Sequence, residues 1–240
     1  MYKNKRILVT ICARGGSKGL PGKNIKVLAG KTLLEHTINS VRHCSLVDRI
    51  ILSTDDGNIK KVGERLGLEV PFLRAKALAT DQSGRVMAVI DAVKRAEKHW
   101  KEEYDVVVDI GNTVPFRQSQ DISACIKKLV DTPKTNLVFT VNEPHHNPYF
   151  NMVEVDGDGN AHLVKRTYVR LRRQDVPPVY DMNDAVFAIW KDKLFQYKSF
   201  IIPRRKIHVM PKERSIDIDS IFDWNVAEYF ALHKNKEKNI

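Results

Sequence analysis

The sequence has no long hydrophobic run. None of its apolar stretches approaches the roughly 18 residues that a membrane-spanning helix needs. Residues 1–6 are basic, and the apolar stretch after them leads into a glycine-rich loop rather than a small-residue cleavage site, which is unlike a signal peptide. We therefore expect a cytoplasmic protein without a membrane partner.

Cysteine is scarce as well. The chain has three cysteines, Cys12, Cys44 and Cys125, and none of them belongs to a CxxC motif. This scattering argues against a disulfide framework and against a zinc site. Cys12 lies in an apolar, strand-like run, so we expect it to pack in the core.

The chain also lacks the usual signs of a nucleic-acid-binding protein, although its net charge is +11. It has no RNP-like aromatic motif, no zinc finger and no long basic tract. Its cations are spread along the chain, with local clusters only at residues 165–173 and 204–206. We therefore favour a polyanionic small-molecule substrate, or a basic surface in contact with solvent, over a nucleic acid.

What the sequence does contain is a regular alternation of strand and helix patterns. The clearest buried strand is residues 104–110, and a shorter strand is expected at residues 68–73. Residues 32–43 predict a helix that begins with a capping box of Thr32 and Glu35. The alternation predicts a three-layer αβα domain with a mainly parallel sheet, whose ligands bind at the carboxyl ends of the strands.

The pattern changes at about residue 142. Prolines and glycines interrupt the chain from there to residue 181, and the turn sequence at residues 156–160 lies between two apolar stretches, which predicts a β-hairpin. We expect residues 142–181 to form a lobe inserted into a single domain of residues 1–240.

Residues 13–24, directly after the first predicted strand, form a candidate binding loop. Glycines such as Gly16 allow backbone amides to converge on an anion, and Arg14, Lys18 and Lys23 add positive charge. The spacing matches neither a Walker A loop nor G-x-G-x-x-G. The position at the carboxyl end of a strand favours a phosphate cradle over a flexible, solvated loop.

Asp217 and Asp219 form a second candidate site. In an extended segment, alternation would place both carboxylates on one side, and hard oxygen ligands beside a triphosphate suit Mg²⁺. Taken alone, the pattern is more typical of a helix start capped by Asp219 or Ser220. Together with the glycine-rich loop it predicts a metal site.

Three further segments carry polar groups near predicted strand ends. Residues 111–117 follow the strongest strand, and Arg117 could pair either with a ligand carboxylate or with a structural acid at the next helix start. The polar and aromatic groups of residues 180–183 could line a sugar pocket. Asp55 and Asp56 could contact a metal or a ribose, but such pairs more often cap the following helix.

Five short motifs occur in the order typical of one enzyme family. They are A-R-x-G-S-K-G-x-x-x-K-N at residues 13–24, S-T-D at 53–55, L-A-x-D at 78–81, T-x-P-x-R at 113–117 and D-I-D-[ST]-x-x-D at 217–223. With these motifs, and over nearly its whole length, the sequence resembles the acylneuraminate cytidylyltransferase family, the CMP-sialic acid synthetases.

The resemblance implies a nucleotide-diphosphosugar-transferase-like, Rossmann-like fold and a homodimer whose inserted lobe swaps across the twofold axis. It also implies a nucleotidyltransferase in which the anomeric hydroxyl of an acidic nine-carbon sugar attacks the α-phosphate of CTP and pyrophosphate leaves. Mg²⁺ or Mn²⁺ would be the cofactor, and no nucleic acid is expected as a partner.

The resemblance also implies roles for the residues that match the family's motifs. The triphosphate would be held by Arg14, Gly16, Ser17 and Lys23, the cytidine by Asn24 and Arg74, and the metal by Asp217 and Asp219, with Arg14, Lys23 and the two aspartates as the catalytic groups. The sugar pocket would include Gly111, Asn183, Phe187 and Phe200, and Arg173 would lie at the phosphate or sugar end, contributed by the same or the partner subunit.

The sequence departs from the sialic acid members at two places. Gly111 stands where they commonly have glutamine, and Asp184 replaces the glycine of an N-G-A motif. Residues 147–151 and 180–183 look more like the bacterial branch that activates legionaminic acid. The expected substrate is therefore a nonulosonic acid of the legionaminic type rather than N-acetylneuraminate.

Two alternatives remain at this point. The chain could activate another acid sugar with CTP, such as Kdo. It could also be a non-catalytic protein that binds sugar nucleotides or nucleic acid, although the presence of Lys23, Asp217 and Asp219 argues against that class.

Overall fold

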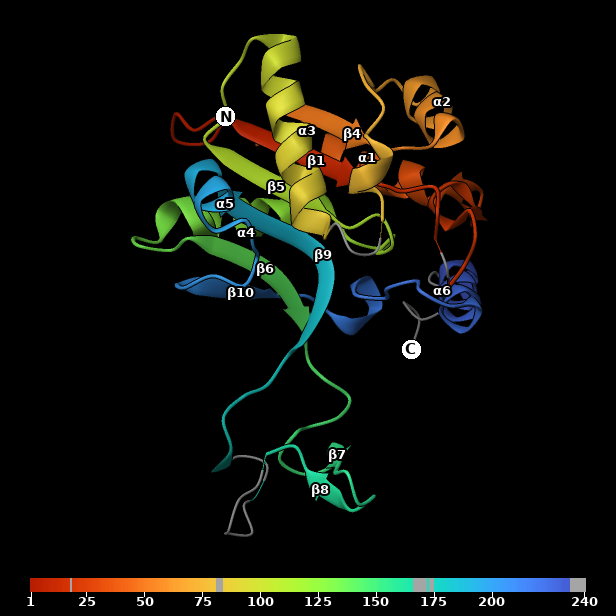
Figure 1. Cartoon of the computed structure of the whole chain (residues 1–240), viewed down its shortest axis with the longest axis vertical. Coiled ribbons are helices and arrows are strands. Elements are labelled where there is room, and N and C mark those ends of the chain that lie inside the picture. Colours follow the sequence, from red (N-terminus) through yellow and green to blue (C-terminus); the bar gives the residue numbers. More distant parts are fainter. Residues whose placement is uncertain (18, 81–83, 166–171, 173–174, 234–240) are drawn as a thin grey trace.

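The computed structural model describes residues 1–17, 19–80, 84–165, 172 and 175–233. A six-stranded sheet with strand order β10-β6-β9-β5-β1-β4 forms its centre (Figure 1). All neighbouring pairs are parallel except those of β9, which runs antiparallel to both β5 and β6. The six strands are β1 (Ile7–Cys12), β4 (Arg49–Ser53), β5 (Val106–Ile110), β6 (Leu137–Asn142), β9 (Asp181–Trp190) and β10 (Arg205–Val209).

Helices cover both faces of this sheet, as the alternation of patterns predicts. Strand β1 explains why, because Ile7, Val9 and Ile11 belong to one apolar cluster while Leu8 belongs to another on the opposite face. One face packs against α1 (Leu33–Arg42), α2 (Gly57–Arg65) and α4 (Ser119–Asp131), and the other against α3 (Arg85–Trp100) and α5 (Lys191–Tyr197). The predicted three-layer αβα fold is confirmed.

A third apolar cluster attaches the end of the described chain to its beginning. Helix α6 (Ile221–His233) contributes Trp224 and Ala227, which pack with Leu20 and Leu28 near the N-terminal loop. The contact brings the segment before α6 beside the loop that follows β1. Outside the segment between β6 and β9, the remaining short elements in the described residues are η1 (Lys23–Ile25), β2 (Val27–Leu28), β3 (Lys31–Thr32), η2 (Lys76–Leu78) and η4 (Lys212–Arg214).

The predicted cap of α1 is confirmed, whereas one predicted strand is absent. Thr32 caps α1, its side chain accepting a hydrogen bond from the Glu35 amide at 3.1 Å. The strand predicted at residues 68–73 is wrong: this segment pairs with no described strand, and Leu68 and Val70 are buried by packing beneath α2 instead. Burial without a sheet partner produces the same apolar pattern as a strand.

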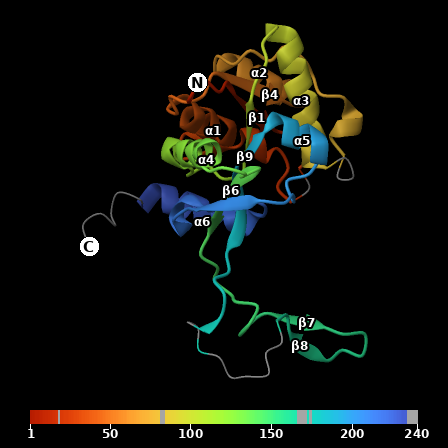
Figure 2. The ribbon, with the colours of Figure 1, turned by 90° about the vertical axis from the view of Figure 1, so that its left-hand side faces the viewer.

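The segment between β6 and β9 leaves the body of the molecule (Figures 1 and 2). It carries the predicted hairpin, formed by β7 (Val153–Val155) and β8 (Ala161–Leu163). The Asp156 carboxylate closes the turn by accepting hydrogen bonds from the amides of Asp158 and Asn160. Among the described residues of the whole chain, no helix has the length and apolar character to cross a membrane.

Candidate active site

The loop after β1 and the segment before α6 meet at one point. Lys23 Nζ donates hydrogen bonds to the Ile218 carbonyl and to Asp219 Oδ1, both at 2.7 Å. Lys23 and Asp219 also line a common cavity of about 370 Å³, together with Arg14, Ser17 and Asn24. The N-terminal loop and the C-terminal aspartate therefore face the same space from different sides.

Close packing requires one of the loop's glycines. A Cβ added at Gly19 would lie 2.3 Å from the Asp219 carbonyl oxygen, so no side chain fits where the loop approaches this segment. Gly16 has open space where a side chain would stand, and Lys18 lies outside the described residues.

Asn24 stabilises the loop from within. Its amide nitrogen donates to the Arg14 carbonyl at 2.8 Å, and its side-chain oxygen accepts from the Asn112 amide nitrogen at 2.9 Å. Asn24 is buried, and Asn112 lies just after β5. These contacts fix the loop against the carboxyl end of the central strand.

A second cavity of about 310 Å³ adjoins the first, and Cys12, Arg14 and Arg85 line both. Its other wall includes Arg74, which is buried and lies 3.5 Å from Asp55 Oδ1 through its Nη2 atom. Burial raises the pKa of the Cys12 thiol to about 12, and the nearby Asp109 carboxylate raises it as well. This environment disfavours the thiolate form of Cys12.

The two aspartates before α6 lie in different surroundings. Ile218 between them is fully buried, and its amide donates to the Thr113 carbonyl at 2.9 Å. Asp217 Oδ1 is buried and has no hydrogen-bond partner among the described residues. Burial raises the pKa of Asp217, a hydrogen bond with Thr113 opposes this rise, and the charge of Asp219 adds to it.

Of the two residues considered as the cap of this helix, the structure shows Ser220, together with Asp223, and not the Asp219 side chain. Asp223 Oδ2 accepts a hydrogen bond from the Ser220 amide at 2.8 Å, and Ser220 Oγ accepts from the Asp223 amide at 3.3 Å. The Asp219 side chain takes no part in this cap. Its carboxylate is 76% exposed and pairs with Lys23.

A partly buried ion pair that is absent from the sequence predictions lies beside the cavity. Asp109 is fully buried in β5 and accepts hydrogen bonds from Thr10 Oγ1 at 2.7 Å and from Arg85 Nε at 2.6 Å. The available signal was an acidic residue within the most apolar strand, because a buried carboxylate needs a partner. Sequence reasoning offered no way to choose Arg85 as that partner.

The residues predicted to form a sugar pocket fall into two groups. Phe187 and Phe200 stack with their ring centroids 4.6 Å apart, and the Arg85 guanidinium lies 5.1 Å from the Phe187 centroid. Asn183 instead donates to Ser215 Oγ at 3.0 Å. Arg173 lies outside the described residues. Gly111 lines the larger cavity and belongs with the Arg85 group.

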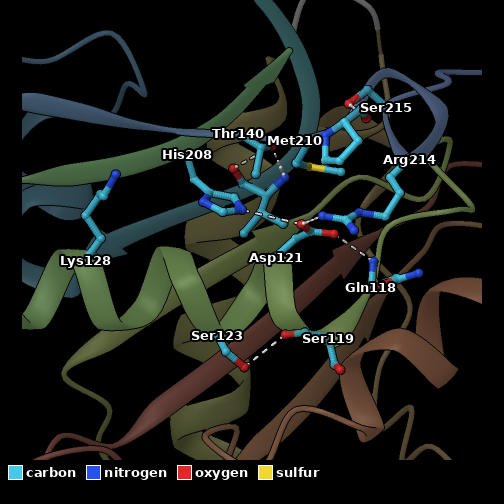
Figure 3. Close-up of polar contacts among 12 residues, drawn as sticks. Gln118, Ser119, Asp121, Ser123, Lys128, Thr140, His208, Met210, Arg214 and Ser215 are labelled. Carbon is cyan, nitrogen blue, oxygen red and sulfur yellow. Dashed lines mark hydrogen bonds and ion pairs between the residues drawn. The ribbon is translucent and has the colours of Figure 1, made fainter.

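The chain before Asp217 is held by a polar network (Figure 3). Asp121, fully buried at the start of α4, accepts from Arg214 Nη2 at 2.8 Å and from the Gln118 amide at 2.9 Å, with His208 Nε2 at 3.4 Å. Burial alone would raise the pKa of Asp121, but these hydrogen bonds hold it below its ordinary value. Arg214 is therefore anchored three residues before Asp217.

Among the described residues, Arg117 forms no hydrogen bond or ion pair with an acid at the start of α4. Its Nη1 donates to the carbonyls of Gly111 and Ala185, and its Nη2 to Ser40 Oγ. Burial lowers its pKa to about 9, while the charge of Asp121 raises it. Arg117 thus ties the end of β5 to β9 through backbone oxygens.

The two aspartates after β4 make different contacts. Asp56 caps α2 by accepting from the amides of Asn58 and Ile59, as the more common reading of such pairs predicts. Asp55 accepts from the Gly15 amide at 3.1 Å and pairs with Arg74.

Comparison with known proteins identifies the family. A sequence profile described as cytidylyltransferase matches residues 8–221. The chain belongs to the cytidylyltransferase family. It is 34% identical to the CMP-N,N'-diacetyllegionaminic acid synthase of Legionella pneumophila, covering 93% of this chain and 95% of that one. It is 33% identical to the post-translational flagellin modification protein B of Campylobacter coli, covering 95% and 96%.

Solved cytidylyltransferase structures share the fold at low sequence identity. A CMP:2-keto-3-deoxy-manno-octonic acid synthetase complexed with CTP aligns with a TM-score of 0.68 at 15% identity, covering 95% of this chain and 99% of that chain. A 4-diphosphocytidyl-2C-methyl-D-erythritol synthase from Anaerococcus prevotii aligns with a TM-score of 0.67 at 18% identity, covering 95% and 96%. The resemblance inferred from the five motifs is confirmed at the level of family and fold.

Proposed function

We propose that this cytidylyltransferase transfers CMP from CTP to the anomeric hydroxyl of a nonulosonic acid of the legionaminic or sialic type, with release of pyrophosphate. The observation that carries the proposal is the contact of Lys23 with Asp219 inside one cavity. It joins the glycine-rich loop to Asp219, one of the two acids proposed to hold the metal, beside the carboxyl ends of the strands, where ligands bind in this type of sheet. The relatives that act on legionaminic acid support this sugar class.

In this proposal, each of the two adjoining cavities binds a different part of the nucleotide. The loop with Arg14, Gly16, Ser17 and Lys23 faces the triphosphate, and Arg74 in the smaller cavity faces the cytidine. Asn24 contributes by holding the Arg14 carbonyl and thus the shape of the loop. The cations would stabilise the negative charge that develops on the leaving pyrophosphate.

Asp217 and Asp219 fit a divalent cation such as Mg²⁺ or Mn²⁺. Both offer hard carboxylate oxygens, and the unpartnered Oδ1 of Asp217 is a buried acceptor that a cation would satisfy. The described residues contain no cluster of three potential protein ligands, so phosphate oxygens would have to complete the shell. When bound, such an ion neutralises phosphate charge and lowers the pKa of a coordinated hydroxyl. Lys23 would exchange Asp219 for a phosphate oxygen as the nucleotide enters.

The projecting segment supports the further proposal of a homodimer. In the single chain, Val153, Val155 and Met182 are 60%, 65% and 50% exposed, although each is apolar. Such side chains gain stability when a second copy covers them. In this assembly the described part of the lobe, residues 142–165 and 175–181, reaches the partner, while Arg173 lies outside the described residues. We place the enzyme in the cytoplasm, where CTP is available.

Pyrophosphate release tests the proposed function directly. The purified chain is incubated with CTP, Mg²⁺ and one of four acids: N,N'-diacetyllegionaminate, pseudaminate, N-acetylneuraminate or Kdo. We expect the highest kcat/KM with the legionaminate, and loss of turnover in Lys23→Ala but not in Lys31→Ala, which changes an exposed lysine. Preference for Kdo would favour that rival. No turnover with any acid, combined with salt-dependent RNA binding, would favour a non-catalytic binding protein.

A further inference from the structure

The larger cavity has cationic groups on two different walls. Arg14 and Lys23 come from the loop after β1, and Arg85 comes from the first turn of α3. Lys23 is paired with Asp219, and the loop cations are the ones that the proposed function assigns to the triphosphate. Arg85 is thus the third cationic side chain among the described residues that line this cavity.

The Arg85 guanidinium is fixed in position by its surroundings. Its Nε donates to buried Asp109 at 2.6 Å, its plane lies over Phe187, and its Nη1 is 3.7 Å from Asp184 Oδ2. A guanidinium held on one edge by a carboxylate and on its face by an aromatic ring loses little further entropy when it binds a ligand. Its remaining Nη2 atom is buried and has no hydrogen-bond partner among the described residues, so a ligand acceptor that reached it would satisfy it.

The strand end beside Arg85 carries no side chain. Gly111 lines the same cavity, and a Cβ added there would lie 2.3 Å from the Asp184 carbonyl oxygen and 3.7 Å from Arg85 Nη2. The backbone of β9, where Asp184 has a positive φ of 52°, therefore excludes any side chain at position 111. Gly111 and Arg85 therefore line the cavity with no side chain of residue 111 between them.

We propose that Arg85 binds the carboxylate of the acceptor sugar and determines the enzyme's preference for acidic sugars. The proposal rests on the proposed function, which supplies an acceptor with one carboxylate in addition to the charged triphosphate. Arginine carries only donors, and its planar fork matches a carboxylate better than a hydroxyl. With the loop cations facing the triphosphate, Arg85 of α3 is the group that neutralises the second anion.

The matched variants are Arg85→Gln and Arg95→Gln. Both arginines lie on α3, both bond an aspartate, and both stack over a phenylalanine, but Arg95 contacts Asp91 and Phe72 away from the cavities. We expect Arg85→Gln to raise the acceptor KM by about 10- to 100-fold, the range of one lost charged hydrogen bond. The Kd of CTP, measured by calorimetry without acceptor, should change less than about twofold in the same variant.

A second experiment combines the Arg85 variant with a change in the carboxylate of the acceptor. The acceptor is replaced by its carboxamide, which lacks the negative charge. Wild type and Arg95→Gln should lose most of their kcat/KM with the carboxamide, whereas Arg85→Gln should hardly distinguish it from the acid. Equal discrimination by wild type and Arg85→Gln would overturn the proposal, as would an unchanged acceptor KM or a matching rise in the Kd of CTP.

Two further variants distinguish loss of acceptor binding from loss of folding. Arg85→Gln leaves Asp109 buried without its cation, so the double variant Arg85→Gln/Asp109→Asn and the charge-conserving Arg85→Lys are measured with it. Arg85→Lys should give a smaller rise in acceptor KM than Arg85→Gln, because lysine retains the positive charge but lacks the planar guanidinium that can bond a carboxylate through two N–H groups. If the wild type releases no pyrophosphate with any acid sugar, both proposals fail. If it turns over normally and only the Arg85 effects are missing, this proposal alone fails.

Discussion

Lys23 Nζ lies 2.7 Å from Asp219 Oδ1, although the two residues are 196 positions apart in the chain. The lysine is mostly covered while the aspartate side chain is 76% exposed, so water screens the pair and its contribution to stability is small. The pair therefore closes the cavity without being needed to hold the fold together.

This relationship predicts that Lys23→Ala separates activity from stability. We expect kcat/KM for CTP to fall by about 10²- to 10³-fold, because a cation that stabilises the leaving pyrophosphate is lost. The thermal midpoint should fall only slightly, because Asp219 remains solvated and only the hydrogen bond to the Ile218 carbonyl is lost. Pyrophosphate release and scanning calorimetry measure the two quantities. Near-normal turnover in the variant would remove Lys23 from the mechanism.

Asp219→Asn and Asp217→Asn should both raise the Mg²⁺ concentration needed for half-maximal turnover, by at least about tenfold. Each change removes a negative charge from the proposed metal ligands while keeping the size of the side chain. Asp158→Asn, in the exposed hairpin turn, is the matched control. A metal titration that is the same for all four proteins would show that these aspartates do not hold the ion.

The sequence was sufficient to place these groups together because each is marked by a local pattern. Glycines and cations after β1, and alternating aspartates before α6, each suggest a strand end, and the carboxyl ends of parallel strands share one edge. The same reasoning could not find the contact between Arg85 and Asp109. That pair joins a helix start to a strand 24 positions away, and only the packing of α3 on the sheet decides it.

The direction of a strand and the reason why a residue is buried could not be predicted from the sequence either. Residues 184–190 predict a strand but carry no information about its direction, and the structure shows β9 running antiparallel within an otherwise parallel sheet. Residues 68–73 are apolar because Leu68 and Val70 fill space beneath α2, not because they pair with a neighbouring strand. Asn183 likewise has the polarity of a ligand contact, but its amide bonds Ser215.

Asp121→Asn should destabilise the protein by about 3 kcal/mol at pH 7, because Arg214 loses its buried carboxylate. The pKa of Asp121 lies below its ordinary value in the folded protein. Its ionised form therefore contributes stability above the unfolded pKa of about 3.9, and this contribution is lost as the pH falls through the lower folded pKa.

Urea denaturation over a pH series measures this effect. The difference in unfolding free energy between wild type and Asp121→Asn should be constant from pH 7 to about pH 5 and should shrink below about pH 4. Asp121→Asn should also raise the Mg²⁺ requirement, since Arg214 anchors the chain that leads to Asp217. A difference that stays constant down to pH 2 would show that the charge of Asp121 is not what stabilises the network.

The proposed homodimer predicts that charge on the hairpin separates the subunits. Light scattering after size-exclusion chromatography should give a mass near twice 27.5 kDa for the wild type and near 27.5 kDa for Val153→Lys/Val155→Lys. Both valines are mostly exposed in the single chain, so the lysines should leave the fold of the subunit intact. Val27→Lys, which alters an equally exposed valine on β2, should remain dimeric. A wild type that is monomeric at micromolar concentration would refute the assembly, whereas a dimer that tolerates the lysines would place its interface on another surface.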